Sequence, residues 1–595
     1  MVKAVRRGAS WAPLLFLSLL PAFAWGQGVG ASAGGVGVSG GPGYTATEVL
    51  PSGAYISSIE IRLSDIPEAV SASDFEASIR AALGIRAGTT WEPALGAAVL
   101  ARVRAQPGVV AASLSAANDR SGRGYRLIVE VRGGAAAEAP VTSGLLAGDG
   151  MEAFPVLYRA GERYLKIELS GGHGLFSDGN PWFGRPDIFT RGNPMTENPE
   201  IGADTGSRAT WVESLLQYGA AGVMPLNDAG LYGFGAITGI GVISYGQDIF
   251  RDGTRTSNNL EKAYLGLLYA PASSDVRLKV SAGRQNYSLN NGFLVSQFGS
   301  QWNAGPRPGV YLAPRTTQDM SVVATASWRP WKTTFFYLDP NELESIESDT
   351  RLLGLNLAHA GTGRWSWDVT ALHVPRSKTG YRVPDDRRLG REGLWTTAAH
   401  LRMSTRPDRP DFWFEAELAH QRHDDFDMSA WAGYGELGYY FRDRRWTPSL
   451  SYRYASFSGD DPLTARYERF DTLYSGGLDY WLQGISINKL LTQANRNSHR
   501  LRVNVAPAPK LNLTLDLYRH RADELNNLGA NPALGTLTSR ELGEEIQLTA
   551  RWQVSPGVLL LGIASAAFPG EAIEAAAEGS ADPWSTLQVQ LFWGF

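Results

Sequence analysis

The histidines and acidic residues are the first side chains to test for chemistry, because the chain contains no cysteine. Without thiols, disulfide frameworks, thiol nucleophiles and thiolate metal sites are excluded. Only 8 histidines occur, and the sequence offers neither a G-x-S-x-G nucleophile elbow between a strand and a helix nor an H-E-x-x-H pair. We therefore expect no enzymatic activity.

Two stretches hold side chains that could bind a metal ion. Residues 420–425 read His-Gln-Arg-His-Asp-Asp, and residues 193–204 are rich in acidic and amide groups. Neither stretch has a recognised ligand spacing. We interpret both as solvated loops and expect no metal and no other cofactor.

A second set of charged side chains recurs at alternate positions of extended segments, a spacing that could line a channel. A wide lumen needs polar lining, and a conduit for an acidic polymer needs cations. The mixture of signs also fits salt bridges that brace a polar interior, and a one-residue bulge would reverse the facing of any strand. By alternation, the predicted inward cations are Lys166, Arg277, Lys279, Arg402, Arg442, Arg453, Arg500, Arg502 and Arg551, and the predicted inward acids are Glu168, Asp368, Glu415, Glu417, Glu436, Asp516 and Glu545.

The elements that must position these residues are segments of about ten residues with strict alternation, the length of a tilted membrane-crossing strand. In 511–518, leucines alternate with Asn512, Thr514, Asp516 and Tyr518. We count about eighteen such segments, an even number as expected for a single-chain barrel. They begin near residues 163, 209, 230, 260, 276, 319, 331, 350, 365, 393, 411, 429, 446, 497, 511, 543, 557 and 585.

The connections between these segments are predicted to alternate strictly between long and short. Short turns face the periplasm and long loops the outside in bacterial barrels, so the N-terminal part is predicted to be periplasmic. The long connection 285–318 contains Phe293, Phe298 and Trp302 and could fold into the lumen as a constriction. A soluble sandwich or propeller would need a second apolar layer, for which the sequence has no candidate.

The composition agrees with a transmembrane barrel in a Gram-negative outer membrane. After the N-terminus no apolar run reaches the roughly 18 residues of a membrane helix, and the mean hydropathy is −0.19. The 18 Trp, 23 Tyr and 22 Phe would supply two aromatic girdles. The net charge of −4 gives no reason to expect a nucleic-acid partner.

The N-terminal region has a different organisation. Lys3, Arg6 and Arg7 precede an apolar run and small residues, the pattern of a cleavable signal peptide. A second unit follows with the predicted order β-α-α-β-β, including a helix with Ser73 as N-cap and Glu76 at capping-box distance. The predicted domains are a signal peptide (1–26), a flexible linker (27–54), an α/β unit (55–133), a second linker (134–155) and the barrel (156–595).

The α/β unit, with LGIRAGTTWEPA between its helices and YRLIVEV at its end, resembles a POTRA domain over about 75 residues. This resemblance implies a periplasmic module that docks partner proteins, often by edge-strand addition. An α/β plug or spacer without a partner remains the alternative.

Several barrel stretches are similar to the alginate-export family of outer-membrane channels. They are KVSAGRQNYSLNNGFLVS at 279–296, LGEEIQLTARWQVSPGVLLLGIASAAFPGE at 542–571 and ADPWSTLQVQLFWGF at the end. The family does not characteristically begin with a POTRA-like unit. The resemblance implies a channel for exopolysaccharide export, with the α/β unit docking periplasmic export components.

Two other functions stay open. POTRA-bearing protein translocases typically carry an Arg-Gly-Tyr/Phe motif on a loop inside the barrel, whereas Arg123-Gly124-Tyr125 lies in the α/β unit here. A general diffusion porin would explain the barrel but not the α/β unit. The last strand, ending in Trp593 and Phe595, resembles the C-terminal signal read by the barrel-assembly machinery.

Overall fold

The computed structural model describes most of residues 56–594. Its gaps are residues 65, 67–70, 90, 92, 105, 107, 119–124, 134–155, 161–162, 272–273, 275, 297–308, 313–316, 329, 343–346, 360–363, 385–386, 388, 406–410, 477–480, 509 and 556–557. The predicted signal peptide and both linkers therefore lie outside the described residues, as do Phe298, Trp302 and Phe595.

The N-terminal unit has the predicted β-α-α-β-β order. It consists of β1 (Ile56–Ser64), α2 (Ala72–Ala82), α3 (Pro93–Arg104), β2 (Val109–Asn118) and β3 (Tyr125–Gly133). In the sheet, β3 lies between β1, which is parallel to it, and β2, which is antiparallel. The helices bury Phe75, Ile79 and Val99 in one core with Trp91, so this unit has a hydrophobic core of its own.

The start of α2 differs from the predicted capping box. The N-cap is Ser71, whose side chain makes no cap hydrogen bond. Ser73 lies inside the helix with its hydroxyl 2.7 Å from that of Ser71, and Glu76 pairs with Arg80 one turn later. The i,i+4 ion pair thus uses the carboxylate that a capping box would need.

Eighteen antiparallel strands form a closed barrel. Each pairs with its neighbours in sequence, and β24 closes the ring by pairing with β5 from Ser585↔Gly179 to Gly594↔Ser170. A short β4 (Val156–Ala160) pairs with the first residues of β5. The strands are β5 (Arg163–Gly179), β6 (Arg208–Pro225), β7 (Leu231–Gln247), β8 (Arg255–Tyr269), β9 (Arg277–Arg284), β10 (Met320–Trp328), β11 (Trp331–Asp339), β12 (Arg351–His359), β13 (Trp365–Arg376), β16 (Leu394–Ser404), β17 (Phe412–His423), β18 (Ala430–Tyr440), β19 (Ser449–Phe457), β20 (Arg496–Ala508), β21 (Leu511–Arg521), β22 (Glu541–Ser555), β23 (Val558–Pro569) and β24 (Trp584–Gly594).

The barrel wall is apolar outside and polar inside. On β22, Ile546 and Leu548 are exposed on the outer face, whereas Glu545, Gln547 and Thr549 are buried. The reason is that lipid replaces water as the outer solvent, so the apolar face of each strand turns outward. Among the described residues, no helix is long and apolar enough to cross a membrane.

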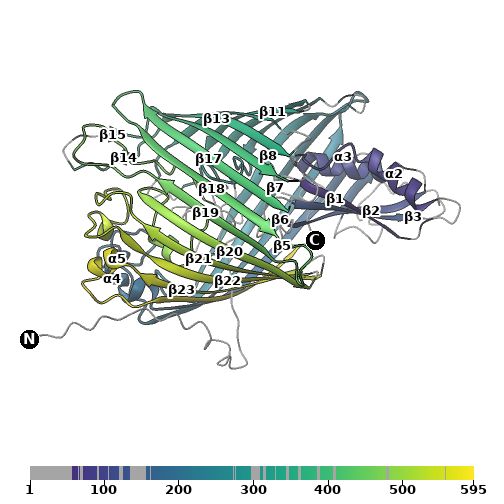
Figure 1. Cartoon of the computed structure of the whole chain (residues 1–595). Coiled ribbons are helices and arrows are strands. Elements are labelled where there is room, and N and C mark those ends of the chain that lie inside the picture. Colours follow the sequence, from purple (N-terminus) through teal and green to yellow (C-terminus); the bar gives the residue numbers. More distant parts are fainter. Residues whose placement is uncertain are drawn as a thin grey trace, which may run out of the picture.

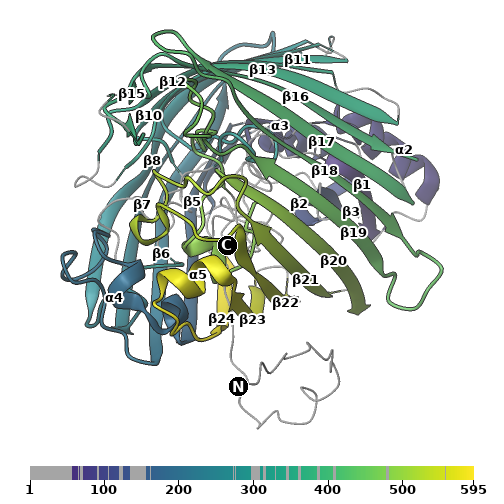
Figure 2. The same ribbon diagram turned by 60° about the vertical axis from the view of Figure 1, so that its left-hand side comes forward.

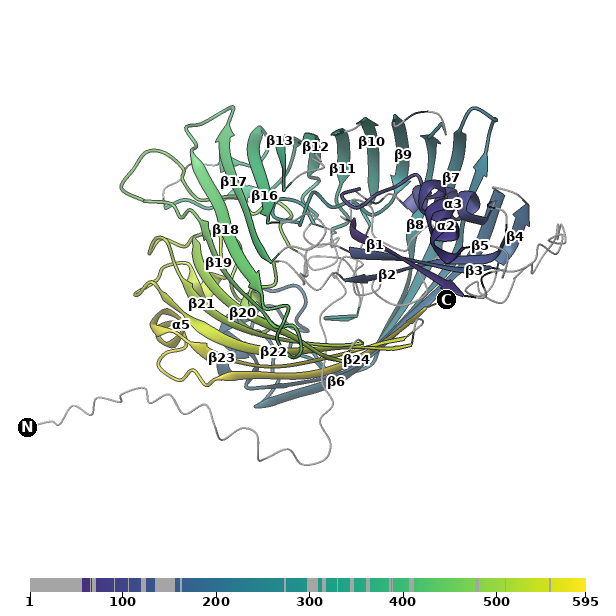
Figure 3. The same ribbon diagram turned by 45° about the vertical axis from the view of Figure 1, so that its right-hand side comes forward.

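The two ends of the barrel differ. One end carries the short elements α4 (Pro186–Phe189), α5 (Glu571–Ala576), β14 (Gly380–Tyr381) and β15 (Leu389–Gly390), and the α/β unit lies at the other (Figure 1). Figure 2 shows the strands arranged around the interior of the barrel. The C-terminus lies at the same end as the α/β unit (Figure 3).

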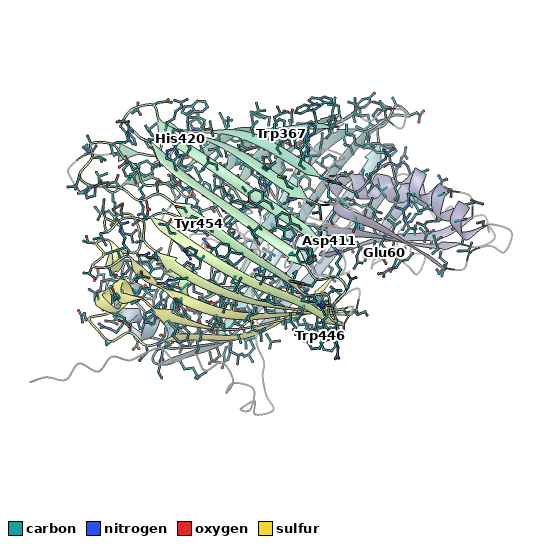
Figure 4. All side chains as sticks on the ribbon, in the orientation of Figure 1. Glu60, Trp367, Asp411, His420, Trp446 and Tyr454 are labelled. Carbon is teal, nitrogen blue, oxygen red and sulfur yellow. The ribbon has the colours of Figure 1, made fainter. Side chains whose placement is uncertain are left out.

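The long connections lie at the end opposite the α/β unit, and the short turns lie beside that unit. Asp411 and Trp446, in or next to two short turns, are near the α/β unit, whereas His420 is near the opposite end (Figure 4). The alternation in length is not strict, because connection 424–429 at the long-loop end is shorter than turn 441–448.

Candidate functional site: the interior of the barrel

Two long connections fold into the barrel interior. The β9–β10 connection contributes Phe293 and Leu312, and the β19–β20 connection contributes Trp481 and Ile487; each side chain is at most 1% exposed. They pack against inward wall residues in two large hydrophobic clusters. The prediction that 285–318 folds inward is confirmed for its described part, whereas the inward path of 458–495 was not predicted.

The first inward segment consists of the described residues of the β9–β10 connection (285–296, 309–312 and 317–319), and its first part is fastened to acidic groups of the wall. Asn290 donates to Asp368 Oδ1 at 2.7 Å, and Asn291 donates to Glu415 Oε1 at 3.0 Å. The side-chain oxygen of Asn291 accepts from the backbone N–H of Phe293 and from Trp481 Nε1. Asn291 thus joins the wall, its own segment and the second segment.

The second segment, 458–495, is fastened by Asp471. Its backbone N–H donates to Gln421 on β17 at 2.7 Å, and its carboxylate accepts from Arg391 at 2.8 and 3.0 Å. Burial alone would lower the pKa of Arg391, but the neighbouring carboxylate of Asp471 outweighs this and raises the pKa, so the guanidinium stays charged. Farther along, Tyr474 forms a parallel β-bridge with Val295, and this bridge joins the two inward segments.

Lys489, in the short turn η4 (Ile487–Lys489), lies where the second segment meets the remainder of the first. Its ammonium group lies 4.8 Å from the ring centroids of Tyr311 and Trp584 and 3.6 Å from Asp178 Oδ2. Burial lowers the pKa of Lys489, because an ammonium group loses hydration there. Cation–π contacts and one carboxylate replace part of that hydration.

Several predicted inward charges pair with each other, either between neighbouring strands (β16 with β17, β20 with β21) or between strands two places apart (β18 with β20). Hydrogen bonds between an arginine and a carboxylate are charge-assisted, and they are strongest where two N–H groups of the guanidinium bind the two carboxylate oxygens. The pairs are Arg402 with Glu415 (3.3 Å), Arg500 with Glu436 (2.6 Å), and Arg502 with Asp516 (2.6 and 2.9 Å).

The other predicted cations lie in different settings. Arg453 is buried with its guanidinium 4.4 Å from the Trp481 ring centroid, and Lys166 is fully buried. Arg277 donates to the carbonyl of Gly84 in the α/β unit at 3.1 Å. Lys279 and Arg551 are half-buried on β9 and β22.

Arg442 does not lie on a strand, in contrast to the prediction. It follows the end of β18, in turn 441–448, and pairs with Asp411 of the adjacent turn at 2.9 Å. Strand β18 ends at Tyr440, so the alternation of the strand does not extend to residue 442.

The remaining predicted acids are buried on the wall. Glu168 pairs with Lys262 at 3.2 Å, and Asp368 lies 2.8 Å from His400 Nδ1. Glu417 is 4% exposed, and its Oε2 has no hydrogen-bond partner among the described residues. Glu545 accepts hydrogen bonds from the backbone of the second inward segment. Whether any of these acids or cations contacts a cargo remains a prediction.

Sequence reasoning missed several residues that hold the interior together, above all Glu213 and Lys489. Glu213 lies on the inward face of β6 and accepts three backbone hydrogen bonds from the first segment. The signal for Glu213 was available: it is an acid at an inward position of an alternating strand. Lys489 lies in a connection without periodicity, so nothing in the sequence indicated its orientation.

Of the two proposed solvated loops, 193–204 is free of helix and strand, whereas 420–425 is partly strand. His420 and His423 belong to β17, and their rings pack on Trp431 and Phe426 with centroids 4.2 and 4.0 Å apart. Throughout the part of the chain that the structure describes, no group of three or more His, Cys, Asp or Glu side chains could hold a metal ion.

Comparison with known proteins gives one family. The family model described as alginate export matches residues 242–584, more than half of the chain. No curated protein is similar enough in sequence to be counted as a relative.

Similar solved structures are porins and porin-like proteins. They include OccK5 (OpdH) of Pseudomonas aeruginosa, OccAB2 of Acinetobacter baumannii and a BenF-like porin of Pseudomonas fluorescens Pf-5, with 9%, 11% and 10% identity and TM-scores of 0.43, 0.44 and 0.45. Each covers 72% of this chain, and 98% of each of those chains is covered. At these TM-scores the likeness is weak.

Proposed function

The chain belongs to the alginate export family, and on this basis we propose that it exports an exopolysaccharide through its barrel across the outer membrane of a Gram-negative bacterium. The observation that carries the proposal is the family match over residues 242–584, which includes both inward segments and strands β8 to β23. The role is transport without catalysis.

The polar inner wall supports passage of a hydrated polymer. Buried glutamines, serines and threonines, such as Gln547 and Thr549, alternate with the paired charges. Such groups exchange hydrogen bonds with sugar hydroxyls, whereas a fully apolar wall would strip the polymer of water without compensation. The paired arginines and carboxylates are compatible with an acidic or a neutral polymer.

We further propose that the α/β unit is POTRA-like and docks a periplasmic component of the export apparatus. Its β-α-α-β-β order and its place at the short-turn end support this role. The sheet edges are β1 and β2, each paired within the sheet only with β3. An extended segment of a partner could add to such an edge through main-chain hydrogen bonds.

The decisive experiment is a gene deletion assayed for two cargoes. We expect the deletion strain to lose surface exopolysaccharide and to keep its secreted proteins, and we expect plasmid-borne wild type to restore the polymer. Unchanged polysaccharide together with loss of one secreted protein would contradict the proposal and favour a protein translocase. Loss of small-solute uptake alone would favour a diffusion porin.

A further inference from the structure

Two buried glutamates of the wall each hold one inward segment by its backbone. Glu213 on β6 is fully buried, and its Oε1 accepts from Val310 N at 2.7 Å. Its Oε2 accepts from Tyr311 N at 3.0 Å and Leu312 N at 2.5 Å. Three consecutive N–H groups thus converge on one carboxylate, and Trp211 Nε1 donates a fourth bond at 2.6 Å.

Glu545 on β22 repeats this arrangement with the other segment. Its carboxylate accepts from Ile485 N at 2.7 Å, from Ser486 N at 3.2 Å and from Ile487 N at 2.9 Å. Glu545 is 2% exposed. Two connections that are far apart in sequence therefore use the same device, three consecutive backbone donors on a wall glutamate.

These bonds fix the wall and the segments to each other. A hydrogen bond to an ionised acceptor is about twice as strong as a neutral one. A buried carboxylate that lost its donors would be left without compensation for its lost hydration. Release of either segment is therefore unfavourable for two reasons: the buried carboxylate loses its donors, and the backbone N–H groups lose their charged acceptor.

The attachments of the first connection lie on opposite sides of the barrel. Glu213 is on β6, whereas Glu415, which binds Asn291, is on β17. In the ring of eighteen strands, β6 and β17 are nine places apart. The β9–β10 connection is thus fastened to diametrically opposed walls, and the bridge between Val295 and Tyr474 joins the second segment to it.

We infer that Glu213 and Glu545 are positioning residues that set the open cross-section of the channel, and thereby its specificity, by holding the two inward segments across the lumen. The inference deepens the proposed export function and rests on it for the nature of the cargo. Neither glutamate needs to touch the polymer, since each acts through the segment that it holds.

The test uses the purified full-length chain in planar lipid bilayers, with variants Glu213→Gln, Glu545→Gln and the double change. The amide keeps the shape of the side chain but removes its charge and turns an NH2 group toward backbone donors. We expect the fraction of time in a higher-conductance state to rise by on the order of tenfold for each single variant, because a charged hydrogen bond is replaced by a poor one. The matched control is Glu541→Gln on the same strand, because Glu541 pairs with exposed Arg519 and Arg521.

A second readout is swelling of proteoliposomes in stachyose, a neutral tetrasaccharide. The Gln variants should admit it faster than wild type and the Glu541 control. Equal conductance and equal swelling in all five proteins would overturn the inference. If a Gln variant fails to show the heat-dependent gel shift of a folded barrel, Val310→Pro decides, because it removes one donor from the segment and leaves the wall intact; wild-type behaviour of that variant would also overturn the inference.

Failure of the inference can be distinguished from failure of the proposed function. A strain without the protein that still exports its exopolysaccharide would remove the function, whatever the conductance of the variants. Wild-type conductance in the variants, combined with lost polysaccharide in the deletion strain, would leave the function and remove the role of the two glutamates.

Discussion

At the scale of single residues, most of the buried charge in the barrel is engaged in bonds within the protein. Arg502 and Asp516 form a two-point pair on adjacent strands, and Asp471 holds Arg391 in the same way. Such pairs contribute less to net stability than to a unique geometry, because dehydration offsets much of their attraction. Lys489 differs. Its ammonium group lies near two aromatic rings, and its ion pair with Asp178 is longer, at 3.6 Å.

This setting predicts a pH dependence that Lys489 controls. Its pKa is lowered by burial from the usual 10.5, so the packed segment binds the proton less tightly than a released one. Stability of the packed state then rises with pH between the lowered value and 10.5, because the released state binds more protons. We expect the open fraction in planar bilayers to fall over that range in wild type.

The control for this prediction is Lys489→Met, which cannot titrate and should remove this part of the pH dependence. An unchanged pH profile in Lys489→Met would assign the effect to another group. An open fraction that rises with pH in wild type would contradict the direction of the pKa shift.

At the scale of elements, the two inward segments form one assembly. Val295 and Tyr474 are bridge partners, and Gly476 N donates to Gly292 O. Both hydrophobic clusters of the interior are built on these segments, so we predict that passage of a polymer requires the segments to move relative to the wall or to each other.

A disulfide across this bridge tests that requirement. Strand-like neighbours lie about 4.8 Å apart, within the range that a disulfide spans, and the chain has no other cysteine. We expect Val295→Cys/Tyr474→Cys to lose polysaccharide export under oxidising conditions and to regain it with a reductant. Each single variant should be insensitive to the reductant, and full export by the oxidised double variant would contradict a need for the segments to separate.

The elements of the barrel were predictable, but the interior was not. Lipid outside and polar groups inside impose a period of two, so the starts of strands such as β11 and β21 could be read within a residue. The inward segments have no such period, and their positions depend on single contacts such as Asn291 with Trp481. For the same reason most of the charges could be placed on strands of the wall, with Arg442 as an exception, whereas their partners could not be predicted.

At the scale of the whole molecule, the α/β unit contacts the barrel through a helix end. Arg277, at the start of β9, donates to Gly84 O, and Arg102 of α3 donates to Leu83 O. Both carbonyls belong to the C-terminal end of α2, where the helix dipole favours cations. The unit therefore lies against the mouth of the barrel at the short-turn end (Figure 3).

Because the α/β unit and the barrel are separate parts of the molecule, we expect deletion of residues 56–133, with the N-terminal 55 residues kept, to affect export and pore formation differently. The strands that close the barrel, β5 and β24, lie outside the deleted part, so the shortened protein should still insert and conduct ions. If the α/β unit docks a periplasmic component, polysaccharide export should be lost although the pore remains. Arg277→Ala is the milder companion change, because it removes one contact between the unit and the barrel and keeps both folded. Normal export by the deletion variant at wild-type abundance would show that the unit is a spacer, whereas loss of the inserted barrel would make the unit a requirement for assembly.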